Sequence, residues 1–296
     1  MFKKKILALT AFALMMGPLT LCAQGTAIEM VRIPGGTFTM GSNDGLDYFA
    51  SPPHRVTLST FSLGKYPVTQ EQWQAVMGTN PSYFQGTDSG RRIASGEVQG
   101  RRPVEMVSWY DAVVFCNKLS MAEGLSPAYR INGSTNPGSW GSVPVWPERN
   151  NSIWDAVIII AGSTGYRLPT EAQWEYAAKG GNGSPGNYLY SGSNTAGDVG
   201  WYEDNSDGRT HEVGKKRANG LGLHDMSGNV WEWCWDWSGD YTNTAKTDPV
   251  GASAGTNRVT RGGGWSSSAS YLRSVYRIDG NPYYRYDFIG FRLARP

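Results

Sequence analysis

Cysteine, histidine and uncompensated charge are all scarce in this chain of 296 residues. It holds 3 cysteines and 3 histidines, and its 27 basic residues nearly balance its 25 acidic ones. Without a basic surplus the chain cannot neutralise many phosphates, so nucleic acid is not expected as a partner. The histidines, His54, His211 and His224, are too scattered to show metal-ligand spacing. These scarcities leave binding or structural roles ahead of the common catalytic ones.

A long hydrophobic run is also missing. Three lysines at 3–5 precede an apolar run over 6–16 and a break over 17–23, which is typical of a secretory signal and too short to span a bilayer. We therefore interpret residues 1–22 as a signal or lipoprotein leader, and expect an exported protein at the cell surface or outer membrane. Acylation of Cys22 would make it a lipid-anchored lipoprotein, and cleavage after Ala23 is the alternative.

Only two cysteines follow the leader, so at most one internal disulfide can form. Cys116 falls on an apolar helical stripe, and we expect Cys116 and Cys234 to be two separate buried thiols. The chain has no charge block, no Pro- or Ser-rich hinge and no repeat of fixed period. A single domain over about 26–296 is the simplest organisation.

Three segments begin with a capping box, in which a hydroxyl side chain caps the third residue and that residue reaches back. The boxes are Thr69–Gln72, Ser108–Asp111 and Thr170–Gln173. Each predicts the start of a helix, and the second helix is expected to run to about Ala122. Prediction is weaker elsewhere, because 38 glycines and 12 tryptophans indicate irregular backbone held by large aromatic anchors.

Alternating apolar residues predict a few strands. Residues 30–42 alternate around Pro34-Gly35-Gly36 and suggest a hairpin, and residues 54–63 suggest another strand. An apolar patch over 153–160 suggests a strand or hairpin arm, and loops are expected to dominate after the third helix. Few regular elements in a long chain favour an α+β fold with a small sheet and long packed loops.

The order of several short motifs resembles the formylglycine-generating enzyme, or sulfatase-modifying factor, family over nearly the whole mature chain. The resemblance implies a variant of the C-type lectin fold with little regular secondary structure. The motifs are Ile33-Pro34-Gly35-Gly36, Tyr66-Pro67-Val68-Thr69, Pro103-Val104, Ser108-Trp109, Gly165-Tyr166-Arg167-Leu168-Pro169-Thr170-Glu171, Gly228-Asn229-Val230-Trp231-Glu232-Trp233, Arg261-Gly262-Gly263 and Gly290-Phe291-Arg292.

Family membership does not settle activity. The enzymes of this family bind copper through two cysteines after the Arg-Gly-Gly element, and thiolates are the soft ligands that copper prefers. Here Ser267 and Leu272 stand at those positions, and neither can supply a thiolate. The sequence therefore predicts no enzyme activity of the formylglycine-generating type.

The family resemblance also implies a structural calcium ion and no other cofactor. The first site would combine two carboxylates with two backbone carbonyls, which suits a hard cation. Its residues are Asp225, Gly228, Val230 and Glu232. A second and weaker site would use Asp198, Val199, Asn205 and Asp207. The alternative for Asp225 and Glu232 is a turn cap and a hydrogen-bonded buried acid.

The segment from about 264 to 288 resembles the variable region of proteins that are diversified by retroelements. Such retroelements mutate adenines, and asparagine codons of the AAC or AAT type rewritten in this way give Asn, Tyr, Ser, Asp, Gly, Ile, Phe and several other residues, but never Lys, Glu, Gln, Met or Trp. None of those five occurs from Ser266 to Phe288. The reachable positions are Ser266, Ser267, Ser268, Ser270, Tyr271, Tyr276, Ile278, Asp279, Gly280, Asn281, Tyr283, Tyr284, Tyr286, Asp287 and Phe288.

These residue types match the composition of an antibody paratope, in which tyrosine supplies rigid amphipathic contacts and serine adapts its hydrogen bonds. We therefore expect a non-catalytic protein that displays a variable surface to a protein or glycan ligand, on host or neighbouring cells. Trp265, Arg277, Pro282 and Arg285 are expected to support the scaffold. The alternatives are an enzyme on the same fold and a structural envelope lipoprotein.

Overall fold

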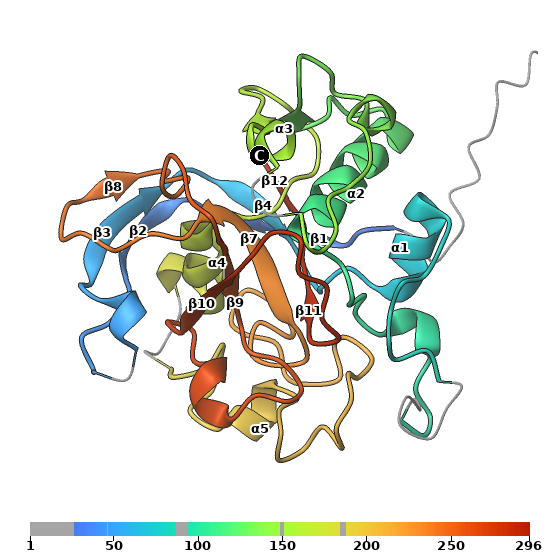
Figure 1. The fold of residues 1–296 in the computed structure, drawn as a ribbon. Helices are drawn as coiled ribbons and strands as arrows, with labels where there is room; N and C mark the ends of the chain where they lie inside the picture. Colours follow the sequence, from blue (N-terminus) through green and yellow to red (C-terminus); the bar gives the residue numbers. More distant parts are fainter. Residues whose placement is uncertain (1–26, 46, 87–93, 149–150, 184–187) are drawn as a thin grey trace, which may run out of the picture.

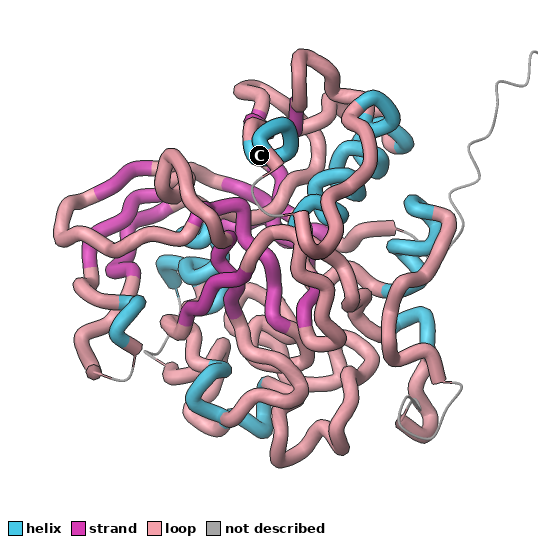
Figure 2. The backbone as a smooth tube through the Cα atoms, in the orientation of Figure 1, coloured by secondary structure: helices cyan, strands magenta, loops and turns pink. Residues whose placement is uncertain are grey.

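The computed structural model describes residues 27–45, 47–86, 94–148, 151–183 and 188–296. The leader expected at residues 1–22, including Cys22, lies outside this part of the chain. Within the described ranges, no helix is both long and apolar enough to cross a bilayer. Loops and turns make up most of the backbone, as the pink tube in Figure 2 shows. The expected α+β class with long packed loops is confirmed.

The N-terminal strands form one long bent hairpin. Strand β1 (Met30–Ile33) pairs with β4 (Phe61–Gly64), and β2 (Gly36–Met40) pairs with β3 (His54–Leu58), all antiparallel and in one continuous register. The hairpin expected within residues 30–42 is therefore wrong. Gly35 lies against the bend of the facing arm, where its N–H donates to Thr60 Oγ1 at 3.1 Å, so the chain continues instead of turning back.

The central sheet has the order β10-β9-β7-β11, formed by Arg277–Gly280, Arg258–Arg261, Trp231–Trp237 and Ile289–Gly290. Every residue of β7 is buried, including the two acids, Glu232 and Asp236. The expectation of loops throughout this region missed this strand. Its Trp residues alternate with Glu, Cys and Asp at the period of two that is typical of a strand, and the expectation did not use this pattern.

All three capping boxes are confirmed. They open α1 (Gln70–Met77), α2 (Trp109–Ala122) and α4 (Glu171–Ala178), each with reciprocal side-chain bonds at the cap. Figure 1 shows α4 behind the central sheet, and α2 and α1 on the other side of β7. The patch over 153–160 is only partly a strand, because its first half forms the short helix α3 (Ser152–Asp155) capped by Asn151.

The remaining elements are short. The strands pair at sheet edges, since β8 joins β3, β12 joins β4, and β5 pairs with β6. Helix α5 is a single turn. Their bounds are Tyr129–Arg130 for β5, Ile158–Ile159 for β6, Ala196–Val199 for α5, Lys246–Thr247 for β8 and Ala294–Arg295 for β12.

Strand β7 divides the interior into two apolar cores. Trp231, Trp233 and Trp235 face the core around α2, whereas Cys234 faces the core between the bent hairpin and α4. Cys116 lies in the first core, so the two thiols are separate, free and buried as expected. The tryptophans thus lie on one face of the strand and fill the core around α2, whereas the opposite face carries Glu232, Cys234 and Asp236.

Candidate ligand-binding surface

The variable segment crosses the central sheet from one edge to the other. Strand β10 lies at one edge and β11 at the opposite edge, so residues 281–288 must pass over β9 and β7 to connect them. Figure 1 shows this crossing as the dark red loop between the labels β10 and β11. The sequence thus places the Tyr- and Phe-rich run over 283–288 across the central sheet.

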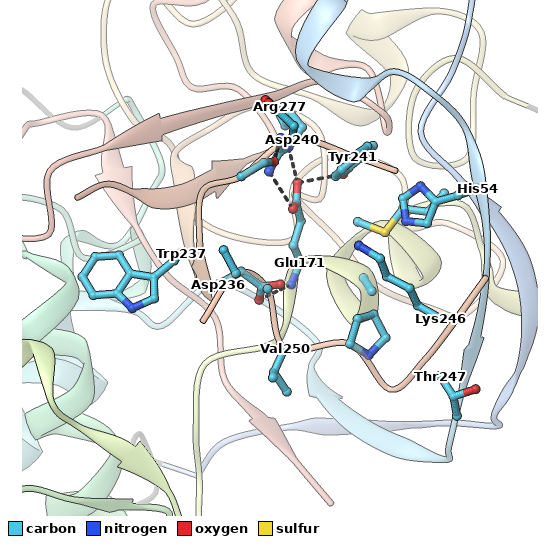
Figure 3. A pocket seen from close by; sticks show the side chains of 16 residues that line it. His54, Glu171, Asp236, Trp237, Asp240, Tyr241, Lys246, Thr247, Val250 and Arg277 are labelled. Carbon is cyan, nitrogen blue, oxygen red and sulfur yellow. Dashed lines mark hydrogen bonds and ion pairs between the residues drawn. The ribbon is translucent and has the colours of Figure 1, made fainter. Parts of the chain in front are cut away.

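The buried Arg277 fixes the start of this crossing. Arg277 donates from Nε to Glu171 Oε1 at 2.6 Å and from Nη2 to Glu171 Oε2 at 2.9 Å, and its Nη1 reaches the carbonyls of Phe49 and Gly239. Figure 3 shows Arg277 and Tyr241 converging on the Glu171 carboxylate. Since Glu171 is the first residue of α4, this ion pair ties β10 to that helix.

Arg285 anchors the middle of the crossing. Its guanidinium donates to both carboxylate oxygens of Asp111, at 2.7 and 3.1 Å, and Asp111 also completes the capping box of α2. Trp265 donates from Nε1 to the Asp287 carbonyl at 3.0 Å. These contacts agree with the scaffold roles expected for Arg277, Arg285 and Trp265.

The fifteen positions of the variable set differ in exposure. Three are buried. Ser267 is 9% exposed, Tyr283 is 3% exposed, and Gly280 is packed against Trp233. Their side chains are not presented to solvent, which departs from the expectation. The others are exposed or half-buried, namely Ser266, Ser268, Ser270, Tyr271, Tyr276, Ile278, Asp279, Asn281, Tyr284, Tyr286, Asp287 and Phe288.

Aromatic side chains form two packed groups along the segment, Tyr283 to Phe288 and Trp231 with Tyr271 and Tyr276. We call this set the aromatic row; its members are Tyr283, Tyr284, Tyr286, Phe288, Trp231, Tyr276 and Tyr271. Neighbouring ring centroids from Tyr283 to Phe288 lie 5.0–5.1 Å apart, and those of Tyr271 and Tyr276 lie 4.8 Å apart. Such spacing is typical of favourable aromatic packing.

Trp231 connects the two halves of the aromatic row. Its ring lies 6.2 Å from Tyr271 and 6.3 Å from Tyr276, and its backbone N–H donates to the Phe288 carbonyl at 2.8 Å. Tyr286 and Tyr271 are the most exposed members of the variable segment in this row, at 41% and 38%. The row therefore offers rigid aromatic edges with polar tips, and the packing beneath them is already formed.

Charge on this surface is sparse and acidic. Asp279 is exposed and accepts from Asn257 Nδ2 at 3.0 Å, and burial raises the pKa of Asp287. The nearby arginines are held in ion pairs beneath the surface. The arrangement can supply aromatic contacts and hydrogen bonds, and the described residues of the segment bring no nucleophile and general base together.

The positions of the family's copper cysteines are filled by scaffold contacts. Ser267 Oγ accepts from the N–H of Gly264 at 3.0 Å and from Trp231 Nε1 at 3.1 Å, and Leu272 is fully buried. Burial raises the thiol pKa of both Cys116 and Cys234, so neither is a ready thiolate. The described residues therefore do not fit a copper site of the family's kind.

A serine flanked by two glycines lies outside the variable segment. Residues 251–255 match Gly-x-Ser-x-Gly, which in hydrolases places serine on a sharp turn between a strand and a helix. Here the match lies in an exposed loop between β8 and β9, and no helix follows it before β9. Ser253 makes no contact with a histidine in the described residues. The match does not form a nucleophile elbow.

The proposed calcium ligands do not converge as they are arranged. Glu232 accepts from Arg292 with both oxygens at 2.7 Å and from Trp174 Nε1 at 2.7 Å, so its carboxylate is fully engaged. Asp225 accepts from Gly214 N and Asn229 Nδ2 instead. The part of the chain that is described holds no group of three or more His, Cys, Asp or Glu side chains suited to a metal ion. Calcium at Asp225, Gly228, Val230 and Glu232 would require Glu232 to leave Arg292.

Two tryptophans beside the segment were missed at the sequence level. Trp146 is 63% exposed and its ring lies 5.9 Å from Tyr283, and Trp231 joins the aromatic row from β7. Trp146 belongs to a loop that precedes the segment by more than a hundred residues. Its position between valine and proline gives no periodic signal, so only the tertiary contact places it here.

Comparison with known proteins gives the family. The sequence signature described as "Sulfatase-modifying factor enzyme 1-like domain" matches residues 19–296. The chain is 39% identical over 272 residues to "Chaperone protein LppX" of Paenibacillus barcinonensis, covering 86% of this chain and 85% of that protein. It is 33% identical over 291 residues to "Formylglycine-generating enzyme" of Thermomonospora curvata, covering 86% of this chain and 88% of that protein.

Solved structures agree with this relationship. "Treponema denticola variable protein 1" is 43% identical, aligns with a TM-score of 0.80, and covers 90% of this chain and 95% of its own. The structure named "CarF" is 29% identical with a TM-score of 0.65, covering 92% of this chain and 99% of its own. The expected resemblance is thereby confirmed, and the chain belongs to the sulfatase-modifying factor enzyme 1-like family, with the C-type lectin fold of formylglycine-generating enzymes.

Proposed function

We propose that this protein is a non-catalytic, exported ligand-binding protein whose segment over about 264–288 is diversified by a retroelement. Its ligand is a protein or glycan presented by a host or neighbouring cell. The proposal includes one domain over 26–296, and anchoring to the outer membrane through Cys22 if that cysteine is acylated.

One observation carries the proposal: the Tyr-, Ser- and Asp-rich positions of the segment are mostly accessible, and the scaffold positions between them are not. Twelve of the fifteen positions expected to vary are exposed or half-buried, whereas Arg277 and Pro282, which lie between them, are buried. A surface that changes from copy to copy must vary where side chains meet solvent and stay constant where they hold the fold. The likeness to "Treponema denticola variable protein 1" supports the same interpretation.

The absence of a thiolate pair supports a non-catalytic role. The family also contains enzymes, and its members named above include a chaperone, so membership alone does not decide between them. Ser267 and Leu272 stand where the oxidases of this family carry their copper cysteines, and neither side chain can supply a thiolate. An assay of the purified chain with copper and a cysteine-containing sulfatase peptide is expected to give no formylglycine, and product formation would contradict the proposal.

The neighbouring DNA provides the decisive test. We expect a near copy of the codons for the last forty or so residues, differing at adenines, beside a reverse-transcriptase gene. In sister isolates, substitutions should gather at exposed positions such as Tyr271, Asp279 and Tyr286, and Arg277 and Arg285 should stay constant. Substitutions that fall on the arginines as often as on the tyrosines would overturn the proposal. An invariant segment would favour the structural envelope lipoprotein instead.

A further inference from the structure

A cavity of about 420 Å³ lies beside the ion pair that fixes β10. It is enclosed by the end of β7, the start of α4, strand β3, and the chain from β8 to residue 252. Arg277 is the one lining residue that lies between 264 and 288. Since 300–1,000 Å³ is the usual size of a small-molecule site, this cavity is large enough to hold one.

Three titratable side chains present unused atoms to this cavity. Asp236 accepts the Glu171 N–H with Oδ2 at 2.8 Å, and its Oδ1 has no hydrogen-bond partner among the described residues. Lys246 forms no ion pair with any described carboxylate. His54 Nδ1 faces the Pro52 carbonyl at 3.3 Å, so it must donate there, which leaves Nε2 as an acceptor.

The two opposite charges lie on different walls. Figure 3 shows the Lys246 ammonium entering the cavity from the β8 side and the Asp236 carboxylate beside the start of α4. Asp236 is 3% exposed, and burial, with the nearby Glu171 carboxylate, raises its pKa to about 7. An added positive group at Asp236 would therefore be favourable, and an added negative group would suit Lys246.

The aromatic residues of the cavity are not free to stack on a sugar. The Trp237 ring is covered by the Arg258 guanidinium, 3.3 Å from its centroid, and Gly255 packs against the same side chain. The Tyr241 ring has the Arg277 guanidinium over it at 4.5 Å, with His54 at its edge at 4.8 Å. Recognition in this cavity must therefore depend on charge and hydrogen bonds more than on ring stacking.

We propose that this cavity binds a small zwitterion of the α-amino acid class. The ligand ammonium lies against Asp236 Oδ1, and the ligand carboxylate lies against Lys246. A side chain of the ligand would occupy the apolar part of the wall formed by Met40 and Val250. Binding is reversible, and it is independent of what the variable segment binds.

Calorimetric titration of the full chain with the twenty proteinogenic L-amino acids tests this inference. At least one is expected to bind with saturation. Its α-hydroxy acid, which lacks the ammonium, and its amide, which lacks the carboxylate, should each bind at least about tenfold more weakly. Asp236→Asn and Lys246→Gln should each weaken the amino acid by a similar factor. Lys118→Gln, an exposed change on α2 outside the cavity, is the matched control.

Asp236→Asn keeps an oxygen to accept from Glu171, and Lys246 is half-exposed, so both variants should fold, which circular dichroism will check. The inference is overturned if no amino acid binds the wild-type chain. It is also overturned if the binding survives both variants, or if the hydroxy acid binds as tightly as the amino acid. Binding of glucose or galactose at this site, lost in Lys246→Gln, would replace the zwitterion with a sugar.

Discussion

Within the variable segment, arginine side chains anchor the backbone and tyrosine side chains form the exposed surface. Arg277 and Arg285 each place a planar guanidinium against a carboxylate with two hydrogen bonds, a geometry that lysine cannot reproduce. Tyr271 and Tyr286 remain about two-fifths exposed, while Tyr271 packs in a T-shaped contact with Tyr276 and Tyr286 stacks on Phe288. Rigid contacts of this kind lose little entropy on binding, which makes them suitable anchors for a ligand.

Replacement of Arg277 by lysine should be strongly destabilising. Lysine can neither engage both oxygens of Glu171 nor reach the Phe49 and Gly239 carbonyls. We expect Arg277→Lys to lower the free energy of unfolding by about 3 kcal/mol in urea denaturation, as when a buried pair is broken. Arg217→Lys is the control, because its pair with Asp198 is 3.3 Å long and exposed, and should change stability by less than about 0.5 kcal/mol. Equal losses in the two variants would contradict this.

The pKa of Asp236 makes a prediction with a definite sign. Burial raises this pKa from 3.8 to about 7, so the folded state favours the protonated acid. The unfolded chain ionises near the ordinary value, and the contribution of Asp236 to stability is therefore lost as pH rises through this window. Compared with Asp236→Asn, the wild-type free energy of unfolding should fall by up to about 1.4 kcal/mol per pH unit between pH ~4 and pH ~7. Denaturation curves of both proteins at several pH values measure the difference, and parallel curves would refute it.

Among the elements, the bent hairpin shows how local pattern and pairing can diverge. The residues at 30–42 do form two strands, but each pairs with the segment over 54–64. Gly35 permits the bend, since a Cβ there would lie 2.4 Å from the Leu58 carbonyl oxygen and 2.8 Å from the Thr60 nitrogen. The close approach involves backbone on both sides, so neither arm can move away without breaking its ladder.

Gly35→Ala should therefore destabilise the protein. Both nearby atoms belong to the backbone, and we expect a loss of about 2–3 kcal/mol in the free energy of unfolding, in the range of overpacking. Gly220→Ala is the matched control, because a Cβ at Gly220 would meet nothing within 4 Å and its φ is not positive. Thermal denaturation of both variants provides the measurement. A control that loses as much as Gly35→Ala would show that the close approach is not the cause.

At the scale of the whole molecule, the residues that stabilise the fold are different from those that the variable segment exposes. Because β10 and β11 lie at opposite edges of the central sheet, the connecting segment must cross its face. The sheet below is held by two cores and by ion pairs on α2 and α4, none of which depends on the exposed members of the segment. The surface can therefore change its side chains while the fold remains.

A library of the fifteen reachable positions should show this separation. Substitutions at Ser266, Ser270, Tyr271, Asp279 and Tyr286 should leave folding within about 1 kcal/mol of the parent, because these residues are exposed. Those at the buried Ser267, Gly280 and Tyr283 should be depleted after selection for protease resistance. Phenylalanine at Tyr283 is the expected exception, since the buried hydroxyl has no partner among the described residues. Uniform tolerance across both groups would contradict this.

The sequence alone determined the features that are written locally. Three capping boxes specified three helix starts, and the ordered motifs specified the family, because each depends on residues close together in the chain. It also excluded a copper thiolate pair at Ser267 and Leu272. Only the tertiary structure decided that β7 is buried on both faces, that the hairpin spans 30–64, that Tyr283 is buried and that Trp146 lies beside it. These depend on which distant segments meet, and strand pairing and burial against remote residues are not recorded in the local pattern of the chain.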